Sequence, residues 1–220
     1  MREIFEAELQ QIGEGLVQMS RLVESAITRA GTALFEADHL LAEDVIASDH
    51  AIDKLERELD ERCVHVLAQQ APVATDLRTV ISALRISATL ERMGDLARHV
   101  AEVARGRYPD VALPEAARDT FVRMHEAAVH AAARTTELLV TRDVALAAEV
   151  ERDDDLLDEL HQDTFAAMLS PDWKGTPQET IDVTLVGRYY ERFGDHGVSV
   201  ARRITFLVTG SFDEHAPVDA

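Results

Sequence analysis

The chain has few of the residues that interrupt regular structure or cross-link it. Its 220 residues include one cysteine, Cys63, with only 10 glycines and 6 prolines. A single cysteine excludes an intramolecular disulfide and a zinc site built on paired thiolates, and it agrees with a reducing cytoplasm. Because so few breakers accompany 46% hydrophobic residues, the composition predicts long regular segments around a substantial core.

Basic residues and long apolar runs are also scarce. The chain has 22 Lys and Arg residues against 41 Asp and Glu residues, which gives a net charge of −19. Nucleic acid is therefore not expected as a partner, since binding it requires basic surface that neutralises phosphates. No apolar run approaches the roughly 18 residues of a membrane-spanning helix, and the amino terminus lacks the apolar stretch of a secretory signal. We expect a soluble, cytoplasmic protein whose acidic surface serves solubility, a cation site or a basic patch on a partner.

Apolar residues recur every three or four positions along almost the whole chain, which is the period of an amphipathic helix. Asp38 and Asp143 have the chemistry of helix N-caps, Pro114 and Pro177 suit a first helical turn, and Gly210 suits a helix end. No segment alternates as a strand would, so the predicted fold class is all-α. Six long helices are expected, at about residues 3–36, 38–71, 73–107, 114–141, 143–170 and 177–210.

A five-residue phrase occurs twice in the chain. Glu91-Arg-Met-Gly-Asp95 and Glu191-Arg-Phe-Gly-Asp195 are separated by 191 − 91 = 100 positions, close to half of the length. The repeat predicts an internal duplication, with one half at residues 1–109, a second at 110–210 and a disordered tail at 211–220. A glutamate and an aspartate four positions apart lie on one helix face, so each copy presents two carboxylates to a metal ion, a basic side chain or water.

A second acidic pair precedes each copy of the phrase. Asp49-His-Ala-Ile-Asp53 corresponds to Asp154-Asp-Leu-Leu-Asp158, at an offset of 158 − 53 = 105. In an antiparallel helical hairpin the two pairs of one half can converge into a cluster of four carboxylates. Such a cluster suits Mg²⁺, Mn²⁺, Ca²⁺ or iron, and without a cation its like charges repel. The alternatives are solvated helix faces, or pairing with basic neighbours such as Arg188.

Two glycines and two histidines accompany the repeated phrase. Gly94 and Gly194 stand inside predicted helices, where glycine costs roughly 1 kcal/mol relative to alanine. Because both halves carry this costly glycine, we expect a close approach to the helix backbone there, either by a crossing helix or by a ligand. His99 and His196 are either additional imidazole ligands or hydrogen-bonded side chains.

Together, the two acidic phrases, the two earlier pairs and the segment Ala71-Pro-Val-Ala-Thr-Asp-Leu-Arg78 resemble the PhoU family of phosphate transport system regulatory proteins. The resemblance implies two tandem three-helix bundles related by a pseudo-twofold axis, in a cytoplasmic protein that forms homodimers and is not an enzyme. It further implies a negative regulator of the phosphate-starvation response, which connects the ATPase subunit of the phosphate ABC transporter to a two-component sensor histidine kinase.

The resemblance also implies multinuclear divalent-metal or iron clusters on the acidic residues. The halves differ, because Asp76-Leu77-Arg78 has no second copy and His99 corresponds to Ser199, so the two sites are expected to differ in metal, affinity or occupancy. The ligands carried over by position are Asp49, Asp53, Glu91 and Asp95 in the first half and Asp154, Asp158, Glu191 and Asp195 in the second.

Two other classes of protein compete with a regulator. A ferritin-like di-metal oxidase would use Glu-x-x-His motifs, and the chain has Glu36-Ala-Asp-His39 at a predicted helix junction and an approximation in Asp158-x-x-His161. The remaining alternative is an acidic helical interaction module without metal. Phosphate-binding loops and nucleophile elbows are absent from the sequence.

Overall fold

The computed structural model describes residues 2–211, with side chains from Phe5 onward, and within that range it consists of helices and connections without strands. The predicted all-α class is confirmed. All six expected helices are present, and the fifth is divided at Asp154 into two shorter helices. The elements are α1 (Arg2–Glu36), α2 (His39–Gln70), α3 (Ala74–Arg107), α4 (Glu115–Thr141), α5 (Val144–Asp153), α6 (Asp155–Leu169) and α7 (Pro177–Thr209).

The helix ends follow the capping chemistry of the sequence. The Asp38 and Asp143 side chains accept backbone hydrogen bonds at the starts of α2 and α5, and Thr176 forms a capping box at the start of α7. Gly210 ends α7 in the left-handed conformation, with φ of 81°. One detail was wrong: Pro114 is the N-cap of α4, with extended backbone, instead of a residue of its first turn.

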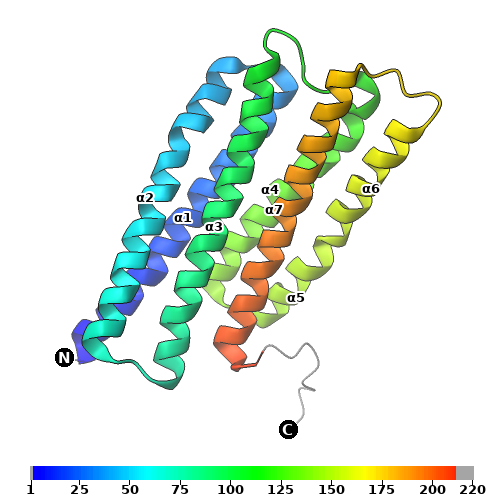
Figure 1. Cartoon of the computed structure of the whole chain (residues 1–220). Coiled ribbons are helices and arrows are strands. Elements are labelled where there is room, and N and C mark those ends of the chain that lie inside the picture. The colour runs from blue at the N-terminus through cyan, green and yellow to red at the C-terminus, as the bar shows by residue number, and fades with distance from the viewer. Residues whose placement is uncertain (1, 212–220) are drawn as a thin grey trace.

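The helices form two groups of three that lie side by side (Figure 1). Helices α1, α2 and α3 pack on one another, and α4, the α5–α6 pair and α7 form the second group. The groups meet where α1 packs on α4 and α3 packs on α7, so α2 and α6 lie at the two outer edges (Figure 1). The motif helices α3 and α7 are therefore central, each with one side toward the other half and one toward its own outer helix.

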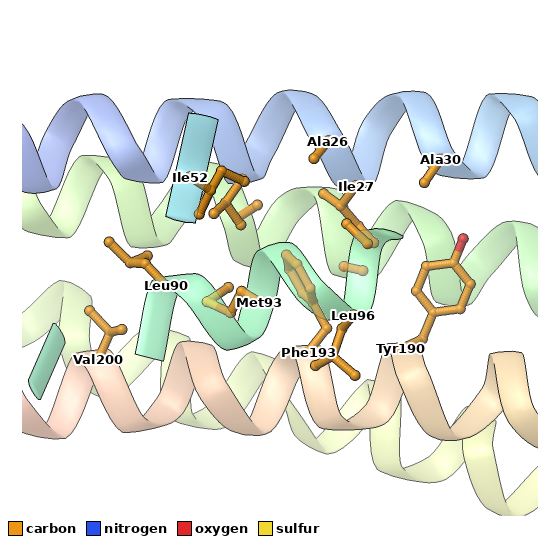
Figure 2. Close-up of a cluster of buried hydrophobic side chains, with 14 of the residues drawn as sticks. Ala26, Ile27, Ala30, Ile52, Leu90, Met93, Leu96, Tyr190, Phe193 and Val200 are labelled. Atoms are coloured by element: carbon orange, nitrogen blue, oxygen red, sulfur yellow. The ribbon is translucent and has the colours of Figure 1, made fainter. Parts of the chain in front are cut away.

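The hydrophobic core runs through both halves without a break. Leu90 and Met93 of α3 correspond by the 100-residue offset to Tyr190 and Phe193 of α7, and all four side chains are fully buried. Figure 2 shows Leu90 and Met93 on α3 and Tyr190 and Phe193 on α7, with Ile27 of α1 nearby. Burial of large side chains in one continuous core stabilises the fold of both halves.

The predicted boundary at residues 109 and 110 falls in the connection between α3 and α4. The predicted disordered tail lies, apart from Ser211, outside the described residues. None of the described helices combines the length with the apolar character that crossing a bilayer requires.

Candidate functional site

The structure brings the predicted acidic residues of each half together along the contact of the motif helix with its outer neighbour. In the first half, burial raises the pKa of Asp49, an effect that Arg98 opposes and the charges of Asp53 and Asp95 reinforce. Burial also raises the pKa of Glu91, and the negative charges of Asp95 and Asp53 add to the increase. We call Asp49, Asp53, Glu91 and Asp95 the first acidic cluster.

The second half contains the corresponding arrangement. Burial, followed by the negative charges of Asp158, Asp195 and Glu191 in that order, raises the pKa of Asp154 to about 7. Burial also raises the pKa of Glu191, with Asp195 adding to the effect. We call Asp154, Asp158, Glu191 and Asp195 the second acidic cluster. A negative charge that raises the pKa of a carboxyl group lies near it, a proximity that the sequence could only infer from helical spacing.

The two motif glycines provide space for the side chains of the neighbouring helix. A Cβ on Gly94 would lie 2.8 Å from Ile52 Cδ1 and 3.3 Å from Asp49 Oδ1. A Cβ on Gly194 would lie 2.0 Å from Asp154 Oδ1 and 2.7 Å from a Leu157 methyl carbon. Of the two interpretations of these glycines, the structure supports a close helix crossing. The crossing seats the first aspartate of each outer-helix pair against the motif helix.

An internal cation occupies the first acidic cluster. The guanidinium of Arg98 donates to Asp49 at 2.8 Å, to Asp95 at 2.7 Å and to Glu102 at 2.7 Å. Arg98 is about three-quarters buried, so these charge-assisted bonds are partly shielded from water. Sequence reasoning missed Arg98. The available signal was that the equivalent position, 100 residues later, is Val198.

The second acidic cluster lacks a cation in that place. Arg188 donates to Glu191 Oε1 at 2.5 Å, which confirms the pairing considered from the sequence. The other oxygen, Glu191 Oε2, and Asp154 Oδ1 are both buried without a hydrogen-bond partner among the described residues. Buried, unpartnered carboxylate oxygens are costly and are the atoms that an added cation would satisfy.

The side chains in the structure are not already arranged around an ion. Within residues 2–211, no group of three or more His, Cys, Asp or Glu side chains is placed to hold a metal ion. The all-oxygen donor set and the two unpartnered oxygens of the second acidic cluster nevertheless suit a hard cation, after rotation of side chains. In the first acidic cluster, the Arg98 guanidinium already provides the compensating charge.

The histidines considered as additional ligands lie against the other half of the protein. The His99 ring packs on Tyr189 of α7, with ring centroids 5.1 Å apart. Burial lowers the pKa of His196, and the positive charges of Arg192 and Arg92 contribute to the lowering. Both imidazoles therefore face the contact between α3 and α7.

The oxidase-like phrase does not form a helical motif. Glu36 is the last residue of α1 and His39 the first of α2, with Ala37 between them at a positive φ of 51°. The His39 ring packs on Tyr108, with centroids 4.1 Å apart. Two ligands three positions apart on one helix are thus not available there.

The comparison with known proteins identifies relatives over almost the whole chain. The family profile described as "PhoU domain" matches twice, at residues 16–104 and 121–204. The chain is 42% identical over 214 residues to the phosphate-specific transport system accessory protein PhoU homolog 1 of Mycobacterium leprae, covering 97% of this chain and 96% of that protein. It is 41% identical to PhoU homolog 2 of Mycobacterium tuberculosis, covering 96% and 100%.

Solved structures agree with this result. PhoU from Pseudomonas aeruginosa is 29% identical and superposes with a TM-score of 0.83, covering 94% of this chain and 100% of that one. The phosphate transport system regulatory protein PhoU from Streptococcus pneumoniae superposes with a TM-score of 0.85 at 23% identity, covering 96% and 100%, which supports the fold.

Proposed function

The chain belongs to the PhoU family, and from this premise we propose that it is an accessory and regulatory protein of phosphate transport. In finer terms, it represses the phosphate-starvation response in the cytoplasm, as a homodimeric adaptor between the ATPase subunit of a phosphate ABC transporter and a sensor histidine kinase. The observation that carries the proposal is the match of both halves to the family, with full-length relatives named for phosphate-specific transport.

The architecture is suited to an adaptor. An adaptor needs no catalytic base; it needs surfaces that bind one partner differently when the other changes conformation, and linkage then transmits the change. The two edge helices, α2 and α6, provide long faces that no other part of the described chain covers (Figure 1). A net charge of −19 favours basic patches on the partners, with the larger effect on encounter rate and specificity.

A metal ion, when bound, would supply positive charge to the acidic residues and cross-link an outer helix to a motif helix. The second acidic cluster would hold it through Asp154, Asp158, Glu191 and Asp195, because two of its buried oxygens have no partner among the described residues. In the first acidic cluster, Arg98 competes for Asp49 and Asp95. We therefore propose that divalent metal binds preferentially to the second half.

A reciprocal exchange of two residues tests this preference. Arg98→Val gives the first half the residue of the second, and Val198→Arg does the reverse. With Mn²⁺ or Fe²⁺ as probe, the first variant is expected to gain metal per chain and the second to lose most of it, because a cation is removed from or added to a carboxylate cluster. Calorimetry and elemental analysis measure the stoichiometry. Equal loss of metal in Asp49→Asn/Glu91→Gln and Asp154→Asn/Glu191→Gln would contradict the preference.

Regulation is tested in cells that lack the gene and any second copy of it. Wild-type protein is expected to restore repression of a phosphate-responsive reporter in high phosphate, whereas a variant with four neutralised cluster residues is expected to leave it derepressed. That variant carries amides at Asp49, Glu91, Asp154 and Glu191. A charge-matched control carries amides at the exposed residues Glu43, Glu61, Asp119 and Asp163. Unchanged repression in the deletion strain would reject the regulatory role, and full function of the cluster variant would remove the clusters from it.

A further inference from the structure

A cavity of about 480 Å³ lies beside α4 at the junction of α5 and α6. Its volume is in the range of small-molecule binding sites. It is lined from α4 by Ala127, His130 and Arg134, from the helix junction by Val150, Arg152 and Leu157, and also by Arg123, Glu126, Ala131, Asp153, Asp154, Leu156 and Gly194. The cavity takes no part in the adaptor role proposed above.

The cavity arises from residues that differ between the two halves. At the 105-residue offset, Ala127 of α4 corresponds to Leu22 of α1, which packs against the core. The outer helix of the first half, α2, continues unbroken past Asp49, whereas its counterpart is interrupted at Asp154. A smaller side chain and a helix break therefore open space on the second half.

The charged groups at this cavity are only partly committed to each other. Arg134 is held by Glu137 and Glu149, and His130 lies 3.3 Å from Asp153. The guanidiniums of Arg123 and Arg152, by contrast, form no hydrogen bond or ion pair with any described residue. The chain has 22 basic against 41 acidic residues, and this cavity brings two available guanidiniums together. The planar guanidinium fork matches phosphate oxygens.

The rest of the lining suits the body of an organic ligand. Ala127, Ala131 and Val150 provide apolar surface, and Leu156 leaves 40% of its surface exposed at the same place. The carboxyl group of Asp154 also lines the cavity. An apolar wall with a few convergent polar groups is the usual composition of a small-molecule site.

From these features we infer that the cavity binds an organic phosphate of about nucleotide size. Arg123 and Arg152 bind its phosphate groups, the apolar wall contacts its ring or aliphatic body, and a hydroxyl or amino group of the ligand donates to Asp154. Because Asp154 also belongs to the second acidic cluster, the ligand contacts the residue that joins the cavity to that cluster.

Isothermal titration of the metal-free, full-length protein tests the site directly, with AMP, ATP and inorganic phosphate as probes. AMP and ATP are expected to bind, and Arg123→Gln/Arg152→Gln is expected to weaken them at least tenfold. The matched control is Arg57→Gln/Arg105→Gln, which removes the same charge from exposed arginines on α2 and α3 and is expected to leave the affinity unchanged. Ala127→Leu, which installs the residue of the first half, is expected to abolish binding by filling the cavity.

Three results would overturn the inference. The first is the absence of AMP and ATP binding at millimolar concentration. The second is inorganic phosphate binding as tightly as AMP, because the apolar wall would then contribute nothing. The third is equal weakening by the two arginine pairs, which would indicate a general effect of charge. Circular dichroism of each variant establishes that the helical fold is retained. If Ala127→Leu fails to fold, the comparison of Arg123→Gln/Arg152→Gln with Arg57→Gln/Arg105→Gln still tests the site.

Discussion

Replacement of Arg107 by leucine is expected to reduce the free energy of unfolding by about 3–5 kcal/mol, because it leaves a buried carboxylate without its cation. Arg107, at the end of α3, donates to both oxygens of Asp182 in α7, at 2.5 and 2.9 Å. Asp182 is 1% exposed, and Gln178 is its other hydrogen-bond donor in the described chain. The pair connects the two halves at one end of the central helix crossing.

The duplication supplies a control for this substitution. A shift of 100 positions relates Arg107 and Asp182 to Leu207 and Ser82, which line one small cavity at the opposite end of the α3–α7 contact. The double variant Arg107→Leu/Asp182→Ser reproduces that pair and is expected to recover most of the lost stability, since no unpaired charge is left buried. Urea denaturation measures both variants. If the Arg107→Leu variant is as stable as wild type, Asp182 does not need Arg107 for its stabilisation.

Addition of one methyl group at Gly31 is also expected to destabilise the protein. A Cβ at this position in α1 would lie 2.2 to 2.7 Å from three atoms of the His125 ring in α4. That ring cannot move freely, because it packs against Phe35 and Tyr190, with centroids 5.7 and 6.0 Å away. Overpacking of this kind typically costs about 1–3 kcal/mol, and the helix-propensity gain of alanine over glycine offsets roughly 1 kcal/mol of it, so the expected net loss is up to about 2 kcal/mol.

The control for Gly31→Ala is Gly106→Ala, because Gly106 is also helical but a methyl group added there would meet no neighbouring atom within 4 Å. That substitution is expected to stabilise the protein by up to about 1 kcal/mol. A double-mutant cycle with His125→Ser assigns the cost to the ring, since Gly31→Ala should then cost much less. Serine is the residue found at the equivalent place in the other half: the symmetric counterpart of the Gly31–His125 contact is Thr136 with Ser20, whose hydroxyl oxygens are 2.8 Å apart. A cost unchanged in the His125→Ser background would mean that the strain lies elsewhere.

The local features of the fold were predictable because they depend on neighbours in the sequence. Helix periods, the caps at Asp38 and Asp143, and the end at Gly210 arise from interactions within a few residues. The break at Asp154 was not predicted, because no proline or glycine marks the position. The interruption is also slight, since the backbone angles of Asp154, −67° and −28°, are still helical. The apolar period simply continued through it.

The candidate site was predictable in part for a similar reason. The four-residue spacing placed each acidic pair on one helix face, and the repeat indicated which pairs should meet. Arg98 was missed because its significance depends on a contact across 49 positions, with Asp49. The sequence also left both interpretations of Gly94 and Gly194 open, and the crossing of the outer helices decided between them.

The sequence alone therefore determined the helices, the duplication and the residues that carry negative charge, since each is written in local spacing and repetition. Only the tertiary structure decided how that duplication is used unequally. The same crossing places an arginine against the carboxylates in one half and leaves two buried oxygens unpartnered in the other. Likewise, the pairs Arg107–Asp182 and Gly31–His125 have different chemistry from their symmetric counterparts. The physical reason is that desolvation and close packing act between residues distant in sequence, where a change of one partner alters the energy of the other.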